Sequence, residues 1–174
     1  QISRQLRGCD QIGAQMRGTG RLYAFDVSGH RLAALQPRLA RSGLGNVHPM
    51  QIAHERDERV ERLAGKVDRV LVDAPCTGSG TLRRHPDLKW RQHDASLAAL
   101  AASQRAIVAA AARLLERGGR LVYATCSVLA AEGEEVAADF ERAAGGAFVR
   151  VAAEKALRRA HVADAAGLVE GEAL

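Results

Sequence analysis

Two cysteines carry most of the chemistry that this sequence can do, because each follows a short apolar run. Residues 70–72 lead into Asp73 and Cys76, and residues 120–123 lead into Cys126. Such runs are typical of buried parallel strands, and the carboxyl ends of parallel strands form the site in an open α/β sheet. We therefore expect two thiols and one carboxylate in a single crevice. This set of groups suits covalent chemistry on an electrophilic ring.

The elements that must position these groups alternate between strands and helices. Strand and helix alternation of this kind indicates a mostly parallel sheet with helices on both faces. The expected strands are residues 21–27, 46–52, 67–72 and 120–124, with a possible edge strand at 148–151. The expected helices are residues 28–41, 55–63, 94–116 and 132–144.

Three details qualify this organisation. Residues 1–17 are polar and aperiodic, so we expect an irregular N-terminal segment, followed by a core at 18–152 and a weakly patterned tail at 153–174. Pro37 lies inside the first predicted helix and predicts a kink or an early end there. The segment 74–90 is a long, basic loop rich in glycine and proline, and such loops in compact domains are usually functional or disordered.

Composition limits the classes of protein to which the chain can belong. Its 174 residues suffice for one domain with a single core. A net charge of +5 suits phosphate binding, but a solvated basic surface explains the charge equally well. Three cysteines cannot all pair, which favours a reducing cytosol. No apolar stretch approaches the length of a membrane span, so we expect a cytoplasmic protein without membrane contact, and a monomer.

The sequence around the two cysteines resembles a known family. Asp-Ala-Pro-Cys at 73–76, followed about fifty residues later by Thr-Cys-Ser at 125–127, is similar to the RNA (cytosine-5) methyltransferases of the Sun/Fmu type. The resemblance continues through residues 83–90 and 25–32, and covers roughly residues 18 to 140. It implies a Rossmann-like class I methyltransferase fold, S-adenosylmethionine as cofactor, and RNA as substrate, with rRNA favoured over tRNA.

The resemblance also implies roles for the catalytic groups. Cys126 is expected to add to C6 of a cytosine, Cys76 to assist release of the enzyme, and Asp73 to hydrogen-bond the base through a carboxyl of raised pKa. DNA cytosine-5 methyltransferases instead use the Pro-Cys cysteine for the attack, which keeps Cys76 open as the nucleophile. The presence of Cys126 favours the RNA-type assignment. Because a free thiol is mostly protonated at neutral pH, we expect the site to lower the pKa of the attacking cysteine.

Further residues are expected to bind the cofactor and the RNA. Asp26 ends a strand where a carboxylate can accept hydrogen bonds from ribose hydroxyls, and Asp73 and Arg31 are placed with it at the cofactor by the resemblance. Basic side chains beside an aromatic ring suit single-stranded RNA. The expected RNA-binding residues are Arg83, Arg84, Lys89 and Arg91. Trp90 can stack on a base or pack in the core, and we favour packing. No metal site is expected.

The sequence also departs from the family pattern. The glycine-rich cofactor loop and its preceding strand, expected just before residue 18, are not recognisable, so the first central strand of the sheet is possibly missing. Gly133 stands where asparagine is common, and residues 50–53 lack an acid. Two hypotheses follow: an active methyltransferase core, or a catalytically silent RNA-binding fragment of such an enzyme. A third possibility is a chain that does not fold alone.

Overall fold

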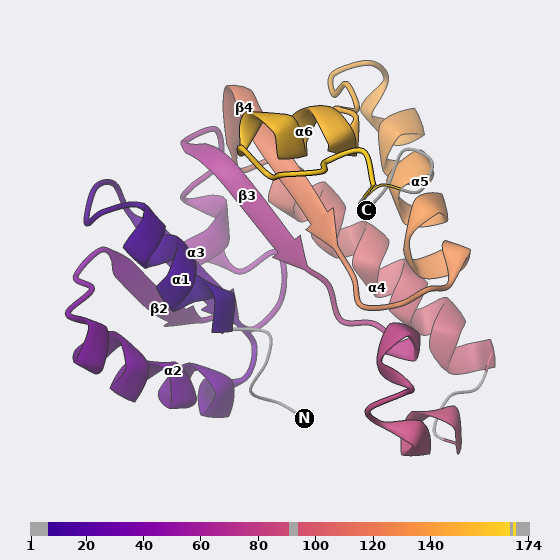
Figure 1. Cartoon of the computed structure of the whole chain (residues 1–174), viewed down its shortest axis with the longest axis horizontal. Helices are drawn as coiled ribbons and strands as arrows, with labels where there is room; N and C mark the ends of the chain where they lie inside the picture. Colours follow the sequence, from indigo (N-terminus) through magenta and orange to yellow (C-terminus); the bar gives the residue numbers. More distant parts are fainter. Residues whose placement is uncertain (1–6, 91–93, 168, 170–174) are drawn as a thin grey trace. The chain divides into compact units, whose positions relative to one another are not determined.

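The computed structural model of the protein describes residues 7–90, 94–167 and 169 (Figure 1). The chain divides into two compact units, Gln1–Val136 and Ala137–Leu174, and each is described by itself. The first unit contains all four strands of the described residues. They form two separate parallel pairs, β1 with β2 and β3 with β4. The described strands therefore form two parallel pairs and not one continuous sheet.

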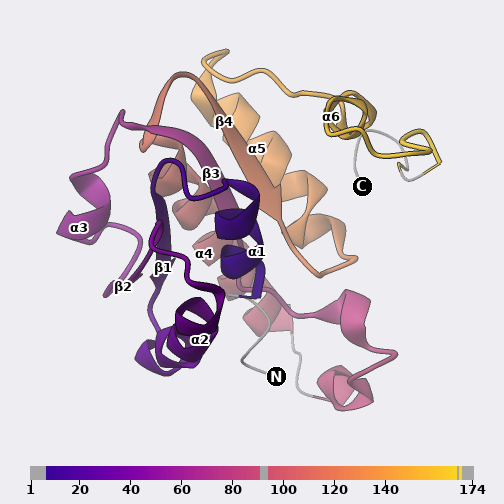
Figure 2. The same cartoon turned by 60° about the vertical axis from the view of Figure 1, so that its left-hand side comes forward.

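The first pair of strands is packed against two helices (Figure 2). The elements are α1 (Arg7–Gln15), β1 (Leu22–Asp26), α2 (Gly29–Ser42) and β2 (Val47–Gln51). The strands align in parallel from Leu22 opposite Val47 to Asp26 opposite Gln51. Their hydrophobic core consists of Ala24, Leu32, Leu35, Leu39 and Val47, with Cys9, Leu22 and Leu44 packed against it.

The second pair of strands carries the two cysteine loops. Its elements are α3 (Glu58–Glu61), β3 (Val67–Asp73), α4 (Asp94–Ala112) and β4 (Leu115–Ala124). Short 3-10 turns follow the strands: η1 (Ser79–Thr81), η2 (Pro86–Trp90) and η3 (Ala130–Glu132). Helix α4 packs against β3, β4 and η3. Because Asp73 is aligned with Ala124 in the parallel register, both strands end at the same edge of the pair.

The second unit holds the remainder of the described chain. Helix α5 (Glu134–Ala144) starts at the end of the first unit, and α6 (Ala153–Arg159) follows. Within this unit the rings of Phe140 and Phe148 meet edge to face with centroids 5.0 Å apart. Arg150 Nε lies 2.6 Å from Glu141 Oε1. One aromatic pair and one ion pair therefore hold the end of α5 to the segment that follows it.

Local sequence explains the limits of α2. Ser28 caps its first turn by accepting a hydrogen bond from the Arg31 backbone N–H, and Gly43 ends it in the left-handed conformation at φ 63°. The helix continues through Pro37, so the predicted break there is wrong. Leu32, Leu35 and Leu39 are buried on one face. Burial of that apolar face offsets the cost of a proline inside the helix.

The structure differs from the prediction at the N-terminus. Arg7–Gln15, expected to be irregular, forms α1. Its sequence contains few large apolar residues, but Cys9 packs against the core and Asp10 pairs with Arg38 of α2. Tertiary contacts of this kind stabilise a short helix that is only marginally stable by itself.

Helix and strand limits in the second half also differ. Helix α4 ends at Ala112 rather than residue 116, and β4 already begins at Leu115. The register of β4 on β3 shifts between Val67 and Arg69, where the strand accommodates its two glycines. Helix α3 is shorter than the predicted 55–63. The expected edge strand at 148–151 does not form, and the tail contains α6.

One expectation about apolar segments needs correction. Ala95–Ala112 is long and apolar enough to cross a membrane, with a mean hydropathy of 1.4. Alanine supplies most of that hydropathy, and the helix contains Gln104 and Arg105. Gln104 is fully buried and makes hydrogen bonds to neighbouring segments. Packing against β3 and β4 identifies α4 as the helix that covers this strand pair.

Candidate active site

The two cysteine side chains meet at the carboxyl ends of β3 and β4. Cys76 Sγ and Cys126 Sγ are 3.3 Å apart. Cys126 is exposed and Cys76 is half-buried, and neither forms a disulfide. The expectation that parallel strand ends bring both thiols into one place is therefore confirmed in the structure. Two thiols at this separation can act on the same ring atom in succession.

The loops that carry the thiols are bonded to each other. The backbone N–H of Gly80 donates to the carbonyl oxygen of Cys126 over 2.9 Å. A Cβ at Gly80 would lie 2.6 Å from that oxygen, so only glycine fits. Ser79 Oγ bonds Ser127 Oγ at 2.9 Å and accepts from the Val128 N–H at 2.9 Å. Gly80 therefore allows the close approach of the second cysteine loop.

The carboxylate of Asp73 has the electrostatic character expected of it. Desolvation by the surrounding protein raises its pKa, although the residue keeps contact with solvent, and the positive charge of Arg31 opposes this shift. The negative charge of Asp73 in turn acts on Cys126. Asp73 therefore interacts electrostatically with both Arg31 and the exposed thiol of Cys126.

The pKa of Cys126 departs from the prediction. Although Cys126 is exposed, desolvation by the surrounding protein raises this pKa to about 11, with further contributions from a hydrogen bond with Cys76 and from the charges of Cys76 and Asp73. The expectation that this site lowers the thiol pKa is therefore wrong for this structure. The largest effects on this thiol within the described part of the chain include no positive side chain that would oppose desolvation. The thiol is protonated at neutral pH, so attack requires a proton acceptor.

Asp26 occupies the end of β1, as predicted. Its Oδ1 lies 2.6 Å from an Arg31 guanidinium nitrogen and accepts the Ser28 backbone N–H at 2.8 Å. The carboxylate side chain is 8% exposed and that of Arg31 is 22% exposed. The two side chains proposed for the cofactor are thus joined in an ion pair. Arg31 fixes the orientation of the carboxylate and also reaches Asp73 electrostatically.

The predicted RNA-binding residues are only partly placed. Arg83 and Arg84 are exposed on the loop between η1 and η2. Arg91 lies outside the described residues, and the side chain of Lys89 is also outside them. Trp90 is 78% exposed, so the expectation that it packs in the core is wrong. An exposed indole next to exposed arginines agrees with the alternative of base stacking.

Sequence reasoning missed one functional candidate, Glu132. Its carboxylate is fully buried and accepts the backbone N–H and the hydroxyl of Thr77, at 2.9 and 2.5 Å. It lies six residues after Cys126 in a segment read only as the start of a helix. An acid near a helix start is usually exposed, so no local pattern indicated that Glu132 is buried.

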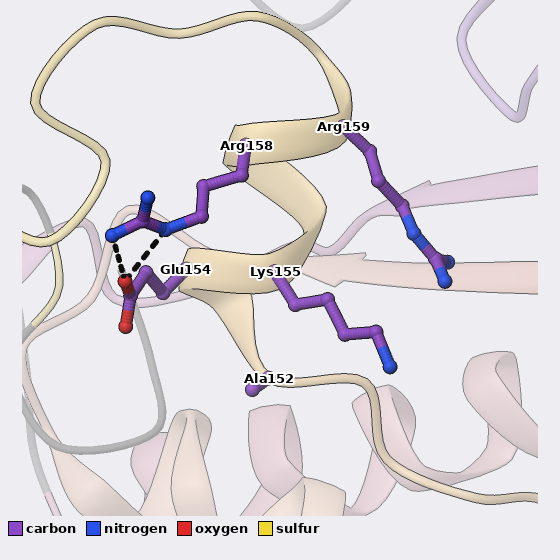
Figure 3. Close-up of a pocket in the computed structure, with 5 residues that line it drawn as sticks. All are labelled: Ala152, Glu154, Lys155, Arg158 and Arg159. Carbon is purple, nitrogen blue, oxygen red and sulfur yellow. Dashed lines mark hydrogen bonds and ion pairs between the residues drawn. The ribbon is translucent and has the colours of Figure 1, made fainter.

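Other candidate sites carry less chemistry. A hollow of about 450 Å³ lies along α6 (Figure 3), lined by Ala152, Glu154, Lys155, Arg158 and Arg159. Glu154 and Arg158 pair along the helix, and Lys155 and Arg159 extend together on another side. All five residues belong to one short segment. Among the described residues no group of three His, Cys, Asp or Glu side chains could hold a metal ion.

Comparison with known proteins shows which family this chain resembles. Residues 10–158 match the model of the family described as 16S rRNA methyltransferase RsmB/F. Ribosomal RNA small subunit methyltransferase B of Sodalis glossinidius is 43% identical over 120 residues, which are 69% of this chain and 27% of that protein. The probable enzyme of the same name from Synechocystis is 41% identical over 71% of this chain and 27% of its own length.

A solved structure supports the same relationship. NSun6 from Pyrococcus horikoshii, solved with SFG, an analogue of S-adenosylmethionine, has a TM-score of 0.66 and 32% identity. The likeness covers 76% of this chain and 33% of that one. It confirms the Rossmann-like methyltransferase fold. The chain spans about a quarter of the length of the curated relatives that it matches. With the family model matching most of its length, the chain belongs to the RsmB/F family of 16S rRNA methyltransferases.

Proposed function

We propose that this chain is the catalytic part of an RNA (cytosine-5) methyltransferase that takes its methyl group from S-adenosylmethionine and acts on ribosomal RNA. The observation that carries the proposal is the 3.3 Å approach of Cys76 and Cys126 at the ends of two parallel strands. Membership of the family supports both the reaction and the class of substrate. We further propose that the protein acts in the cytoplasm as a monomer.

The residues at the strand ends fit the cofactor. The ion-paired carboxylate of Asp26 suits the ribose hydroxyls, because a carboxylate accepts both of their hydrogen bonds. Arg31 pairs with Asp26 and also acts electrostatically on Asp73. When bound, the cofactor supplies an electrophilic methyl group on a sulfonium. The protein residues bind the cofactor, orient the base and handle the protons.

The first step on the base is addition of Cys126. Its Sγ forms a bond to C6 of cytosine as the C5–C6 double bond opens, which makes C5 nucleophilic. The thiol proton must leave, because the raised pKa keeps Cys126 protonated at rest. Asp73 acts electrostatically on this thiol, and its raised pKa suits a carboxyl that takes up that proton and shares it with N3 of the ring.

The second step is release. After C5 has accepted the methyl group, a water molecule takes up the C5 proton as the C6–Sγ bond breaks, which restores the double bond and frees Cys126 as a thiolate. Cys76 Sγ lies 3.3 Å from the departing sulfur and can donate a hydrogen bond to it as negative charge develops. The two thiols thus divide addition and elimination between them.

The exposed basic loop supplies the RNA contacts in this proposal. Arg83 and Arg84 suit phosphate groups, and Trp90 offers an exposed ring for base stacking. Lys89 and Arg91 extend the same basic run in the sequence. This loop follows Cys76 directly along the chain, so we expect RNA bound to the loop to extend toward the thiols.

The experiment that tests the proposal is methyl transfer from tritiated S-adenosylmethionine to unmodified 16S rRNA. We expect label at cytosine C5 and a covalent protein–RNA complex that survives denaturation. Soluble, folded protein that transfers no label would refute the proposal. Fully methylated rRNA is the matched control, because its target C5 already carries the methyl group.

One observation favours a second candidate, a silent RNA-binding protein of the same family. A thiol with a pKa of about 11 is a poor nucleophile at neutral pH. Calorimetry separates the two candidates. Micromolar binding of S-adenosylmethionine favours the enzyme, whereas RNA binding without any cofactor binding favours the silent protein. In the enzyme we expect bound RNA to lower the pH at which Cys126 is alkylated, because a proton acceptor is then engaged.

A further inference from the structure

Glu132 holds a fully buried carboxylate at the base of the cysteine loops. Its Oε1 accepts the Thr77 backbone N–H at 2.9 Å and the Gln104 Nε2–H at 3.0 Å. Its Oε2 accepts the Thr77 hydroxyl at 2.5 Å. A buried carboxylate is retained only where donors replace the water it loses.

The same network reaches the second cysteine loop. The Ser127 hydroxyl lies 3.3 Å from Thr77 Oγ1, and the Thr77 hydroxyl donates to Glu132. Thr77 directly follows Cys76, and Ser127 directly follows Cys126. Glu132 therefore binds the residue next to Cys76 directly and reaches the residue next to Cys126 through the Thr77 hydroxyl.

Gln104 fixes the carboxylate from helix α4. Its Nε2 donates both to Glu132 and to the carbonyl oxygen of Pro75, the latter at 2.8 Å. Both partners are acceptors only, which settles the orientation of the amide. Its Oε1 is buried and has no hydrogen-bond partner within the described part of the chain. The Gln104 side chain is therefore held by the two hydrogen bonds that its Nε2 donates.

The backbone of Glu132 is also anchored. The Tyr123 hydroxyl, on β4, donates to the Glu132 carbonyl oxygen at 2.5 Å. Burial alone would raise the pKa of the Glu132 carboxyl, but the nearby Ser127 hydroxyl and the hydrogen bonds from Thr77 and Gln104 outweigh burial and hold the pKa below its usual value. The group is therefore ionised at neutral pH and acts only as an acceptor.

We infer that Glu132 is a positioning residue that sets the separation of the two thiols by holding Thr77, whose hydroxyl meets that of Ser127. Where it concerns catalysis, this inference rests on the proposed function. Addition and release both occur at one ring carbon, so both sulfurs must reach the same point. A misplacement of about 1 Å can cost about 100-fold in rate.

A reagent that reports thiol separation tests this inference without methyl transfer. Phenylarsine oxide condenses with two neighbouring thiols, forming two As–S bonds and releasing one water. We expect folded wild-type protein to bind it at Cys76 and Cys126. Cys76→Ser removes one of the two thiols and defines the background.

Glu132→Gln is the principal variant, because it keeps the shape and replaces an acceptor by a donor that faces other donors. We expect its affinity for phenylarsine oxide to fall at least tenfold. Glu135→Gln, at an exposed position of α5, is the matched control and should bind as the wild type does. The single-turnover methylation rate of Glu132→Gln should fall about 100-fold, with KM for the cofactor unchanged.

A second pair of variants guards against loss of folding. Thr77→Val removes the hydroxyl that donates to Glu132, and Thr77→Ser keeps it. We expect Thr77→Val to weaken arsenical binding and Thr77→Ser to restore it.

Folded Glu132→Gln that binds the arsenical as tightly as the wild type would overturn the inference. If Glu132→Gln does not fold, equal binding by the two Thr77 variants overturns it. Wild-type protein that fails to bind phenylarsine oxide also overturns it. Wild-type protein that binds the arsenical but transfers no methyl group refutes the proposed function alone.

Discussion

The two strand pairs of this molecule are stabilised by different interactions. Around β1 and β2, the charged contacts are the ion pairs of Asp10 with Arg38 and of Asp26 with Arg31, beside one buried hydrogen bond from Asn46 to the Gly13 carbonyl oxygen. Around β3 and β4, hydrogen bonds from uncharged groups converge on one buried carboxylate, that of Glu132.

The difference matches what each half is proposed to do. Binding of a charged cofactor depends on electrostatics, which ion pairs adjust and salt screens. Covalent addition to a ring carbon depends on atomic placement, which a buried hydrogen-bond network fixes. Asp73 lies between the two, since Arg31 acts on it and it acts on Cys126. Substitutions on the two sides should therefore produce different kinds of loss.

The largest loss is expected from Cys126→Ala. Removing the attacking sulfur prevents addition to C6, so turnover should fall at least about 1000-fold and no covalent RNA adduct should form. Rapid-quench methylation and denaturing gels measure the two effects. Cys9→Ala is the control, because Cys9 packs beside the hydrophobic core. An adduct that persists in Cys126→Ala would reassign the attack to Cys76.

Cys76→Ala should separate addition from release. Cys126 can still add to the ring, but the departing sulfur loses the partner 3.3 Å away. We therefore expect the covalent adduct to accumulate while multiple turnover stops. Gel quantification of the adduct over time measures this. Wild-type adduct levels together with lost turnover would contradict the division of roles between the thiols.

The cysteine site around β3 and β4 could be predicted from the sequence more fully than the fold around it. The convergence of Cys76 and Cys126 follows from strand-end motifs, because parallel strands bring their carboxyl ends together. Helix α1 was missed because the contact of Asp10 with Arg38 joins residues far apart in the chain. The raised pKa of Cys126 and the burial of Glu132 were missed for a related reason. Both depend on which segments exclude water from the site, and no local pattern encodes that.

On the cofactor side, Asp26→Ala should weaken cofactor binding with little effect on the rate at saturation. The carboxylate is proposed to bind ribose hydroxyls, and its loss also releases Arg31 from its ion pair. We expect Kd for S-adenosylmethionine to rise about 10- to 100-fold, a loss of about 1.4–2.8 kcal/mol, measured by calorimetry. A large fall in the rate at saturating cofactor would show instead that Asp26 also aligns the cysteine side.

The smallest effect is expected from Asp10→Asn, which tests whether the first half depends on ion pairs. Arg38 donates to both carboxylate oxygens of Asp10, with distances of 3.1 and 2.5 Å. Both side chains are about one quarter exposed, so the pair should contribute about 0.5–1 kcal/mol to the free energy of unfolding.

The contribution of the Asp10–Arg38 pair to the free energy of unfolding should depend on both pH and salt, which distinguishes it from other small effects. The hydrogen bond with Arg38 lowers the pKa of Asp10 in the folded protein below its usual value of 3.8. Its contribution is therefore present above that value and is lost as the pH falls through the lower, folded-state pKa. Urea unfolding at pH 7 and at acid pH should show the free energies of unfolding of wild type and Asp10→Asn converging as the pH falls.

High salt should reduce the difference between these two free energies at pH 7. It should leave the loss of stability caused by Thr77→Val unchanged, because screening weakens exposed ion pairs and not buried hydrogen bonds. Equal salt sensitivity of the two losses would remove the distinction between the two halves.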